Sequence, residues 1–163
     1  DKNPKQNIIY PSPQGIKLNN NLSRELSQRD ELTFICGHYE GIDERVIEEF
    51  VDIEISIGDY IISGGELSTL VILDSTLRFI PNFIKESSSQ NESFEDNLLD
   101  NGVYTRPSEG VPEILLSGNH SLIEKYREQD RLYRTLLKRP DILSKKDISK
   151  LKKIISDIEK QVQ

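Results

Sequence analysis

The chain has 163 residues, of which 35% are hydrophobic and 30% charged, and its formal net charge is −7. This length suits one well-packed core with room for a small second module. No apolar run approaches the roughly 18 residues of a membrane span, and the single cysteine, Cys36, excludes an internal disulfide framework and fits a reducing cytoplasm.

Three short apolar segments, each followed by a loop that contains glycine, organise the first half of the chain. These strand candidates are residues 8–10, 33–36 and 51–57. Helical patterns occupy residues 20–28, 42–51 and 66–80. Strands that alternate with helices predict an α/β fold with a parallel sheet. Because ligands bind such sheets beyond the carboxyl ends of the strands, we expect the three glycine loops to form one site.

The third of these loops is the most informative stretch of the sequence. Gly58, Gly64 and Gly65 lie between a strand and a helix, where glycine lets the backbone approach a ligand closely. The spacing matches neither the dinucleotide-binding fingerprint nor a phosphate-binding P-loop. The loop therefore predicts a small ligand held by main-chain groups, and an ordinary turn with glycine caps is the alternative.

The second half of the chain has a polar, Ser/Asn/Glu-rich start and a helical end. Residues 82–102 predict a flexible linker or lid, least structured at residues 85–91. A cap at Asn119 predicts a helix that continues to about residue 138. Ser144 and Asp147 have the spacing of a capping box for a last helix.

Charge is distributed unevenly along the chain. Residues 1–120 have a balance of −12, whereas residues 121–163 carry 12 basic and 7 acidic side chains, a balance of +5. This basic end is compatible with nucleic-acid contact, and a solvated helix surface is the alternative. The candidate phosphate contacts are Arg106, Arg127, Arg131 and Arg134. The two histidines and one cysteine have no metal-ligand spacing, so we expect no metal site of that kind.

Several motifs occur in an order that covers nearly the whole chain. They are Ser12-Pro13-Gln14-Gly15, the segment from Gly37 to Arg45, the segment from Ser56 to Leu67, Arg78-Phe79-Ile80-Pro81, Tyr104-Thr105-Arg106-Pro107, and the segment from Val111 to His120. Together they make the chain resemble the bacterial tRNA (guanine-N1)-methyltransferases, members of the knotted SPOUT class.

This resemblance implies a fold and an assembly. It implies a SPOUT-type parallel sheet with a deep trefoil knot, plus a small α-helical carboxyl-terminal domain. The expected parts are a knotted cofactor-binding domain at 1–81, an interdomain linker at 82–102 and a helical tRNA-binding domain at 103–163. The family's amino-terminal portion is expected to be missing from this chain. The implied protein is a cytoplasmic homodimer without a membrane segment, with each active site at the subunit interface.

The resemblance also implies a reaction and its residues. The reaction is transfer of a methyl group from S-adenosylmethionine to N1 of the guanosine 3′ of the tRNA anticodon, with a magnesium requirement left open. Arg78 matches a residue tied to catalysis, and Glu92 falls where the family usually has an aspartate base. His38 stands in place of an arginine. The implied cofactor residues are Tyr10, Pro11, Gly37, Glu40, Ser56, Ile57, Gly58, Asp59, Tyr60, Ile61, Ile62, Gly64 and Gly65.

Two other functions remain open at this point. A non-catalytic RNA- or cofactor-binding fragment would retain the glycine loops without completing the active site. A SPOUT methyltransferase that acts on another RNA would share the cofactor loops and differ in substrate.

Overall fold

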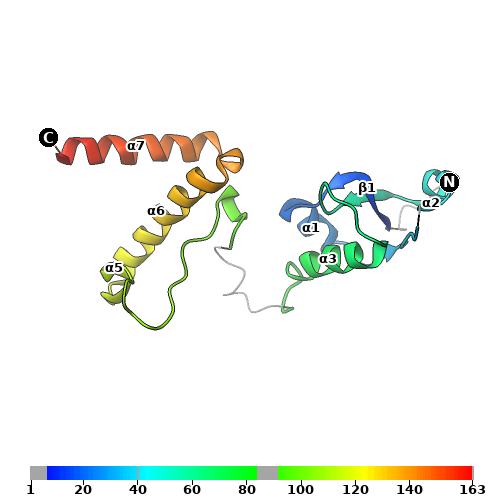
Figure 1. Cartoon of the computed structure of the whole chain (residues 1–163), viewed down its shortest axis with the longest axis horizontal. Helices are drawn as coiled ribbons and strands as arrows, with labels where there is room; N and C mark the ends of the chain where they lie inside the picture. Colours follow the sequence, from blue (N-terminus) through cyan, green and yellow to red (C-terminus); the bar gives the residue numbers. More distant parts are fainter. Residues whose placement is uncertain (1–6, 40, 84–91, 163) are drawn as a thin grey trace. The chain divides into compact units, whose positions relative to one another are not determined.

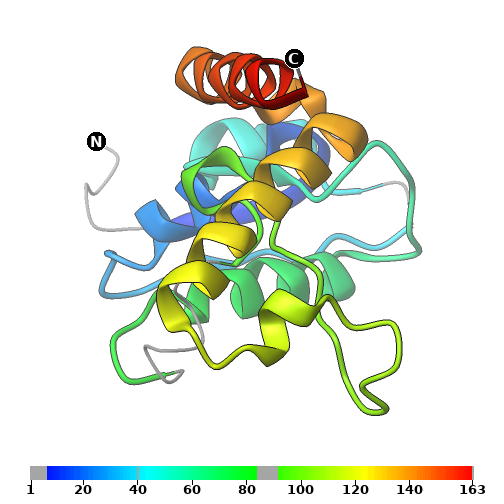
Figure 2. The same cartoon turned by 90° about the vertical axis from the view of Figure 1, so that its left-hand side faces the viewer.

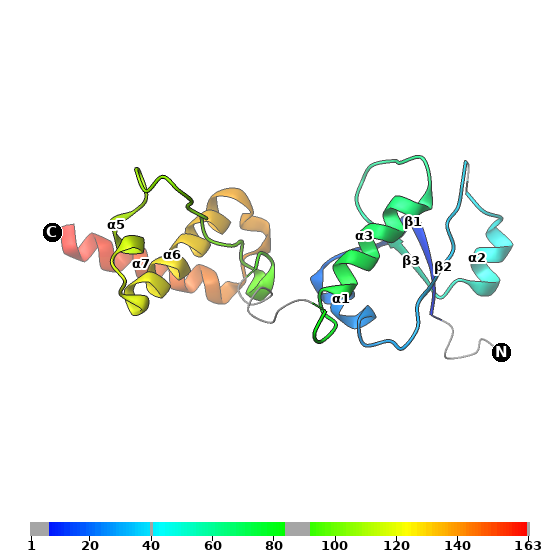
Figure 3. The ribbon, with the colours of Figure 1, turned by 90° about the horizontal axis from the view of Figure 1, so that it is seen from below.

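A three-stranded parallel sheet forms the centre of the first half of the chain. The computed structural model describes residues 7–39, 41–83 and 92–162. The strands are β1 (Ile8–Lys17), β2 (Thr33–Phe34) and β3 (Ile53–Ser56), in the order β2-β1-β3. Both neighbours run parallel to β1 (Figure 3), which confirms the α/β sheet expected from the alternation of strands and helices.

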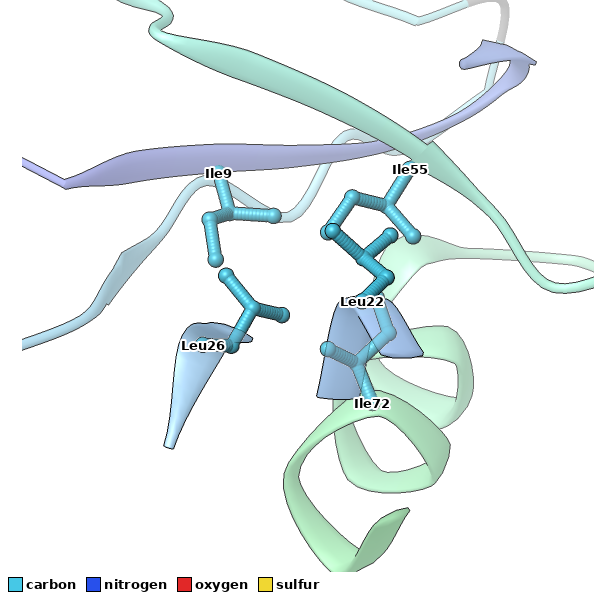
Figure 4. Close-up of a cluster of buried hydrophobic side chains, with 5 residues drawn as sticks. All are labelled: Ile9, Leu22, Leu26, Ile55 and Ile72. Atoms are coloured by element: carbon cyan, nitrogen blue, oxygen red, sulfur yellow. The ribbon is translucent and has the colours of Figure 1, made fainter. Parts of the chain in front are cut away.

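Helices α1 (Asn20–Leu26) and α3 (Gly65–Leu77) pack on one face of this sheet, and α2 (Glu44–Phe50) joins β2 to β3. The Ser23 and Ser75 hydroxyls are 2.5 Å apart and join α1 to α3. The core side chains point toward one another between the sheet and these helices (Figure 4). They are Ile9, Leu22, Leu26, Ile55 and Ile72. This core fixes the positions from which the loops extend.

Strand β1 is longer than the sequence suggested. Residues 11–15, expected to form a loop, lie within the strand, which bulges so that Pro11 and Ile16 both pair with Ile55. Gly15 makes this possible, because a Cβ at that position would collide with the backbone of Glu54. A glycine taken as a turn signal is therefore a site of close contact between two strands.

Helix α3 ends earlier than its apolar pattern suggested. The prediction continued the helix to residue 80, whereas the last helical residue is Leu77. The amide of Phe79 donates to the carbonyl oxygen of Thr76 and that of Ile80 to Leu77, three residues back instead of four. The chain therefore tightens into turns before it reaches Pro81.

The trefoil knot stays a prediction from the resemblance.

The chain divides into two compact units, Asp1–Ser89 and Gln90–Gln163. The second contains η1 (Glu95–Asn97), α5 (Glu113–Leu116), α6 (His120–Lys138), η2 (Pro140–Ile142) and α7 (Lys145–Val162). Helices α6 and α7 run in different directions on either side of η2 (Figures 1 and 2). The domain boundaries inferred from the resemblance remain predictions.

Two sequence-predicted caps begin the long helices of the second unit. The Asn119 side chain accepts a hydrogen bond from the Leu122 amide at the start of α6. At the start of α7, the Ser144 amide donates to Asp147 Oδ2 over 3.0 Å, and the Asp147 amide donates to Ser144 Oγ over 3.2 Å. This reciprocal arrangement confirms the capping box.

The end of the expected linker packs on α6. Leu98 is buried, the Leu99 amide donates to Thr135 Oγ1 over 2.9 Å, and the Gly102 amide donates to Asp130 Oδ2 over 2.7 Å. Residues 98–102 therefore form part of the second unit. Their polar composition had suggested a flexible linker, whereas the structure fixes them on α6. Residues 85–91, predicted to be least structured, lie outside the described residues.

Within the described ranges, no helix is both long and apolar enough to span a bilayer.

Candidate functional site

A cleft of about 240 Å³ opens beyond the carboxyl ends of β2 and β3, beside the bulge of β1. Among the predicted cofactor residues that the structure describes, all except Asp59 line it. These lining residues are Tyr10, Pro11, Gly37, Ser56, Ile57, Gly58, Tyr60, Ile61, Ile62, Gly64 and Gly65. The three glycine-bearing segments therefore meet at one place, as parallel strands require.

The two longer loops of the cleft are joined through their backbones. His38 and Gly64 form an antiparallel bridge, and the Gly65 amide donates to the Gly37 carbonyl oxygen over 3.1 Å. A Cβ on Gly65 would lie 3.0 Å from the Cα of Cys36, so a larger residue there would require the neighbouring backbone to shift by a few tenths of an ångström. Cys36 itself is half-buried and just beyond β2.

Local hydrogen bonds also shape the loop that follows β3. Ser56 Oγ accepts from the Gly58 amide and donates to the Gly58 carbonyl oxygen, both over 3.2 Å. Gly58 has φ of 151°, a value that residues other than glycine rarely adopt. A serine and a glycine two residues apart thus turn the chain from the strand into the wall of the cleft.

One described cofactor candidate, Asp59, has another position. Asp59 does not line the cleft, because its Oδ2 lies 2.9 Å from Lys17 Nζ at the end of β1. Glu40 lies outside the described residues. We infer that Asp59 fixes the loop, whereas its predicted contact with the cofactor has no support from this geometry.

Sequence reasoning missed part of the lining. The additional residues are Ser12, Pro13, Tyr39, Gly41, Ile55, Ser63 and Ser68. Most are immediate chain neighbours of predicted residues, so the motif boundaries were drawn too narrowly. Ser68 is buried in α3 and lies three residues after Gly65, a helical spacing that could have indicated its position.

One side-chain contact joins the two loops at the cleft. His38 Nε2 lies 2.7 Å from Glu66 Oε1, and both side chains are more than half exposed. This contact adds to the backbone bridge between His38 and Gly64. An arginine at position 38, the residue implied by the resemblance, would also reach a carboxylate.

We expect Glu66→Gln to weaken S-adenosylmethionine binding by up to about fivefold, since an exposed pair is worth roughly 0.2–1 kcal/mol. His38→Arg places a guanidinium beside Glu66 and should retain the affinity. Calorimetry measures the S-adenosylmethionine affinity of both variants. Glu25→Gln is the matched control, because it breaks an ion pair with Arg29 outside the cleft lining. Equal effects of Glu66→Gln and Glu25→Gln would contradict a specific role of the His38–Glu66 contact.

The two predicted catalytic residues belong to different units. Arg78 is half-buried and caps the carboxyl end of α3 in the first unit. Glu92 is half-buried in the second unit, three residues before η1. Arg78 and Glu92 each have contacts of their own. That the two residues act in one active site stays a prediction from the resemblance.

The four candidate RNA-contacting arginines fall into two groups. Arg131 is buried and its Nε donates to the Leu99 carbonyl oxygen, whereas Arg134 Nε lies 2.7 Å from Asp130 Oδ2. The hydrogen bond with Asp130 raises the pKa of Arg134 above its already high ordinary value. Arg131 thus contacts the segment at residues 98–102 directly, and Arg134 pairs with Asp130, which accepts from the Gly102 amide. The RNA contacts of these two arginines stay predictions.

Arg106 and Arg127 have exposed positions that suit an RNA contact. Both line a second cleft, formed by the segment before α5 and by α5 and α6.

Within the described part of the chain, no group of three or more His, Cys, Asp or Glu side chains is arranged to hold a metal ion.

Comparisons with known proteins identify the family of this chain. The model of the family described as tRNA (Guanine-1)-methyltransferase TrmD matches residues 1–145. The tRNA (guanine-N(1)-)-methyltransferase of Fusobacterium nucleatum is 46% identical over 94% of this chain and 67% of its own length. The enzyme of that name from Mycoplasma capricolum is 47% identical over 99% of this chain and 68% of its own.

A third relative, the tRNA (guanine-N(1)-)-methyltransferase of Carboxydothermus hydrogenoformans, is 50% identical over 93% of this chain. The chain spans 63% of that relative's length, and about two thirds of the lengths of the other two. The family model matches most of the chain and the relatives are similar along nearly all of it. The chain therefore belongs to the tRNA (guanine-1)-methyltransferase TrmD family.

Proposed function

We propose that this protein methylates N1 of the guanosine 3′ of the anticodon in tRNA, with S-adenosylmethionine as the methyl donor. The observation that carries the proposal is the cleft at the carboxyl ends of β2 and β3. It gathers the glycine loops that the resemblance assigns to the cofactor, in a chain that belongs to a tRNA (guanine-1)-methyltransferase family.

The composition of the cleft suits this cofactor. Glycines at 37, 58, 64 and 65 let a ligand approach the backbone closely, and Ile57, Ile61 and Ile62 supply apolar walls. The volume of about 240 Å³ lies just below the range of roughly 300–1,000 Å³ typical of ligand pockets, so it suits one small ligand. We assign the adenosine and methionine parts to these main-chain and apolar groups.

The proposed mechanism assigns one task to each catalytic side chain. When bound, S-adenosylmethionine supplies an electrophilic methyl group, so the protein must align the guanine and remove its N1 proton. Glu92 accepts that proton as general base, which makes N1 nucleophilic. The Arg78 guanidinium donates to guanine O6 and stabilises the negative charge that develops there.

The proposed assembly is a homodimer in the cytoplasm. Helix α3 supports it, because Leu67, Leu70 and Val71 lie on the surface of the single chain with exposed fractions of 63%, 60% and 47%. Apolar side chains grouped in this way suit a subunit interface.

Arg106 and Arg127 are the proposed contacts with the RNA.

A methylation assay with the full-length protein tests the proposal. The substrates are an unmodified tRNA transcript with guanosine 3′ of the anticodon and the same transcript with adenosine there, each with and without Mg²⁺. We expect 1-methylguanosine at that nucleotide of the first transcript alone, detected by mass spectrometry. Cofactor binding without methylation of any tRNA would favour the non-catalytic alternative. Methylation at another position or of another RNA would favour the other SPOUT activity.

A further inference from the structure

A second cleft, of about 460 Å³, lies within the second unit. Its walls come from the segment before α5, from α5 and from α6. They combine an aromatic ring, two guanidinium groups and several aliphatic side chains, among them Tyr104, Arg106, Arg127, Leu115 and Leu116. The cofactor site described above uses none of these residues.

One wall of this cleft is held rigidly on α6. The Leu99 amide donates to Thr135 Oγ1 and the Gly102 amide donates to Asp130 Oδ2. Gly102 itself lines the cleft. A wall fixed in advance lowers the entropy that a ligand must lose on binding.

Tyr104 lies beside Tyr126 of α6. Burial raises the pKa of Tyr126, and the neighbouring Tyr104 side chain adds to this effect. The Tyr104 side chain nevertheless remains 42% exposed and lines the cleft. A partly exposed aromatic ring in the wall of a cleft suits stacking against a planar ligand.

The two cations at this cleft are available to an anion. Arg106 is exposed, and no hydrogen bond or ion pair holds its guanidinium among the residues that the structure describes. Arg127 pairs with Glu124 over 3.2 Å, three residues earlier on the same helix, and both side chains are largely exposed. Such a pair stabilises the fold little and can give way to a phosphate.

We propose that this cleft binds one unpaired nucleotide of the RNA substrate, with its base on Tyr104 and its phosphate oxygens on Arg106 and Arg127. The inference rests on the proposed function, because it takes RNA as the substrate. Proteins recognise single-stranded RNA by stacking bases on aromatic side chains and by contacting the backbone with cations.

The composition of the cleft favours a nucleotide over other anions. A lone phosphate or carboxylate would use the guanidinium groups and leave the aromatic and aliphatic walls without a partner. Leu116 on α5 is 59% exposed and Val103 is 81% exposed, so apolar surface adjoins the cations in the free protein. A nucleotide contacts both kinds of surface, whereas an RNA duplex presents its backbone and keeps its bases stacked.

The test compares RNA affinities by fluorescence anisotropy, using the full-length protein. The probes are the unmodified tRNA transcript, a short single-stranded oligoribonucleotide and a duplex RNA of the same length. Tyr104→Ala should weaken binding of the tRNA and of the single strand by about tenfold, a typical effect of losing one stacked base. Tyr104→Phe should keep the affinity within about twofold, and Tyr133→Ala on α6 is the control for an exposed tyrosine outside the cleft lining.

The guanidinium groups have their own test. Arg106→Gln combined with Arg127→Gln should weaken binding and lower the salt slope by about 0.7 for each phosphate that is no longer neutralised. Lys125→Gln combined with Lys138→Gln removes the same charge from α6 outside the cleft and should change the slope less. Leu116→Glu alters an exposed position, so it should fold normally and weaken binding by repelling the phosphate. Thermal unfolding and cofactor calorimetry verify that each variant folds.

Each outcome decides between distinct conclusions. Unchanged affinity in the Tyr104→Ala, double-arginine and Leu116→Glu proteins would overturn the nucleotide site while tRNA methylation stands. Equal losses for duplex and single-stranded RNA, or equal effects of the lysine and arginine pairs, would reduce the cleft to general charge attraction. A protein that binds RNA through this cleft but never methylates it would refute the proposed function alone.

Discussion

Replacing Glu92 by glutamine should lower the single-turnover rate of tRNA methylation by roughly 10²–10⁴-fold, the usual contribution of a general base. Glutamine preserves the shape of the side chain and cannot accept the guanine N1 proton. S-adenosylmethionine affinity should stay within about twofold, because Glu92 acts on the nucleophile. Rapid-quench methylation with saturating tRNA and calorimetry with the cofactor measure the two quantities on the full-length protein.

Two further substitutions make the Glu92 result specific. Glu92→Asp should retain substantial activity, since it keeps the carboxylate and matches the residue implied by the resemblance. Glu109→Gln is the matched control, because Glu109 is an exposed acid of the same unit. A near-normal rate for Glu92→Gln would show that another group takes the proton, and Asp96 in η1 would then be tested next.

The parts of the fold that follow from local patterns could be predicted from the sequence. The alternation of polar and apolar residues at 51–57 predicted β3, and Asn119 and Ser144 predicted two helix starts. The extension of β1 could not be predicted in this way. Pro11, Pro13 and Gly15 are typical of turns, and the pairing of Lys17 with Ser56 depends on a strand nearly forty residues later.

The candidate site shows the same division between local and long-range information. Adjacent glycine motifs predicted most of the cofactor cleft, because the ends of parallel strands must converge. The burial of Arg131 and the pairing of Arg134 with Asp130 depend on residues 98–102, which composition assigned to a linker. Charge along one helix does not reveal which side chains an approaching segment will cover.

The second large effect concerns Gly37, where the cofactor cleft adjoins Tyr10. We expect Gly37→Val to weaken binding of S-adenosylmethionine and of its demethylated product alike, by roughly 100-fold. A Cβ on Gly37 would lie 3.0 Å from Tyr10 Oη and 3.2 Å from Tyr10 Cε2. Tyr10 is buried in β1, and both residues line the cleft. Overpacking of this kind costs about 1–3 kcal/mol.

Position 37 isolates this steric effect from backbone strain. Gly37 does not adopt a positive φ, whereas Gly58 has φ of 151° and any substitution there would also strain the chain. Gly37→Ala should therefore fold and lose affinity by a smaller factor. Tyr10→Phe removes the hydroxyl that the new methyl group meets, so the Gly37→Ala, Tyr10→Phe double variant should recover part of that loss. Calorimetry with both ligands measures the series, and thermal unfolding verifies the fold. Wild-type affinity in both Gly37 variants would place the cofactor outside this cleft.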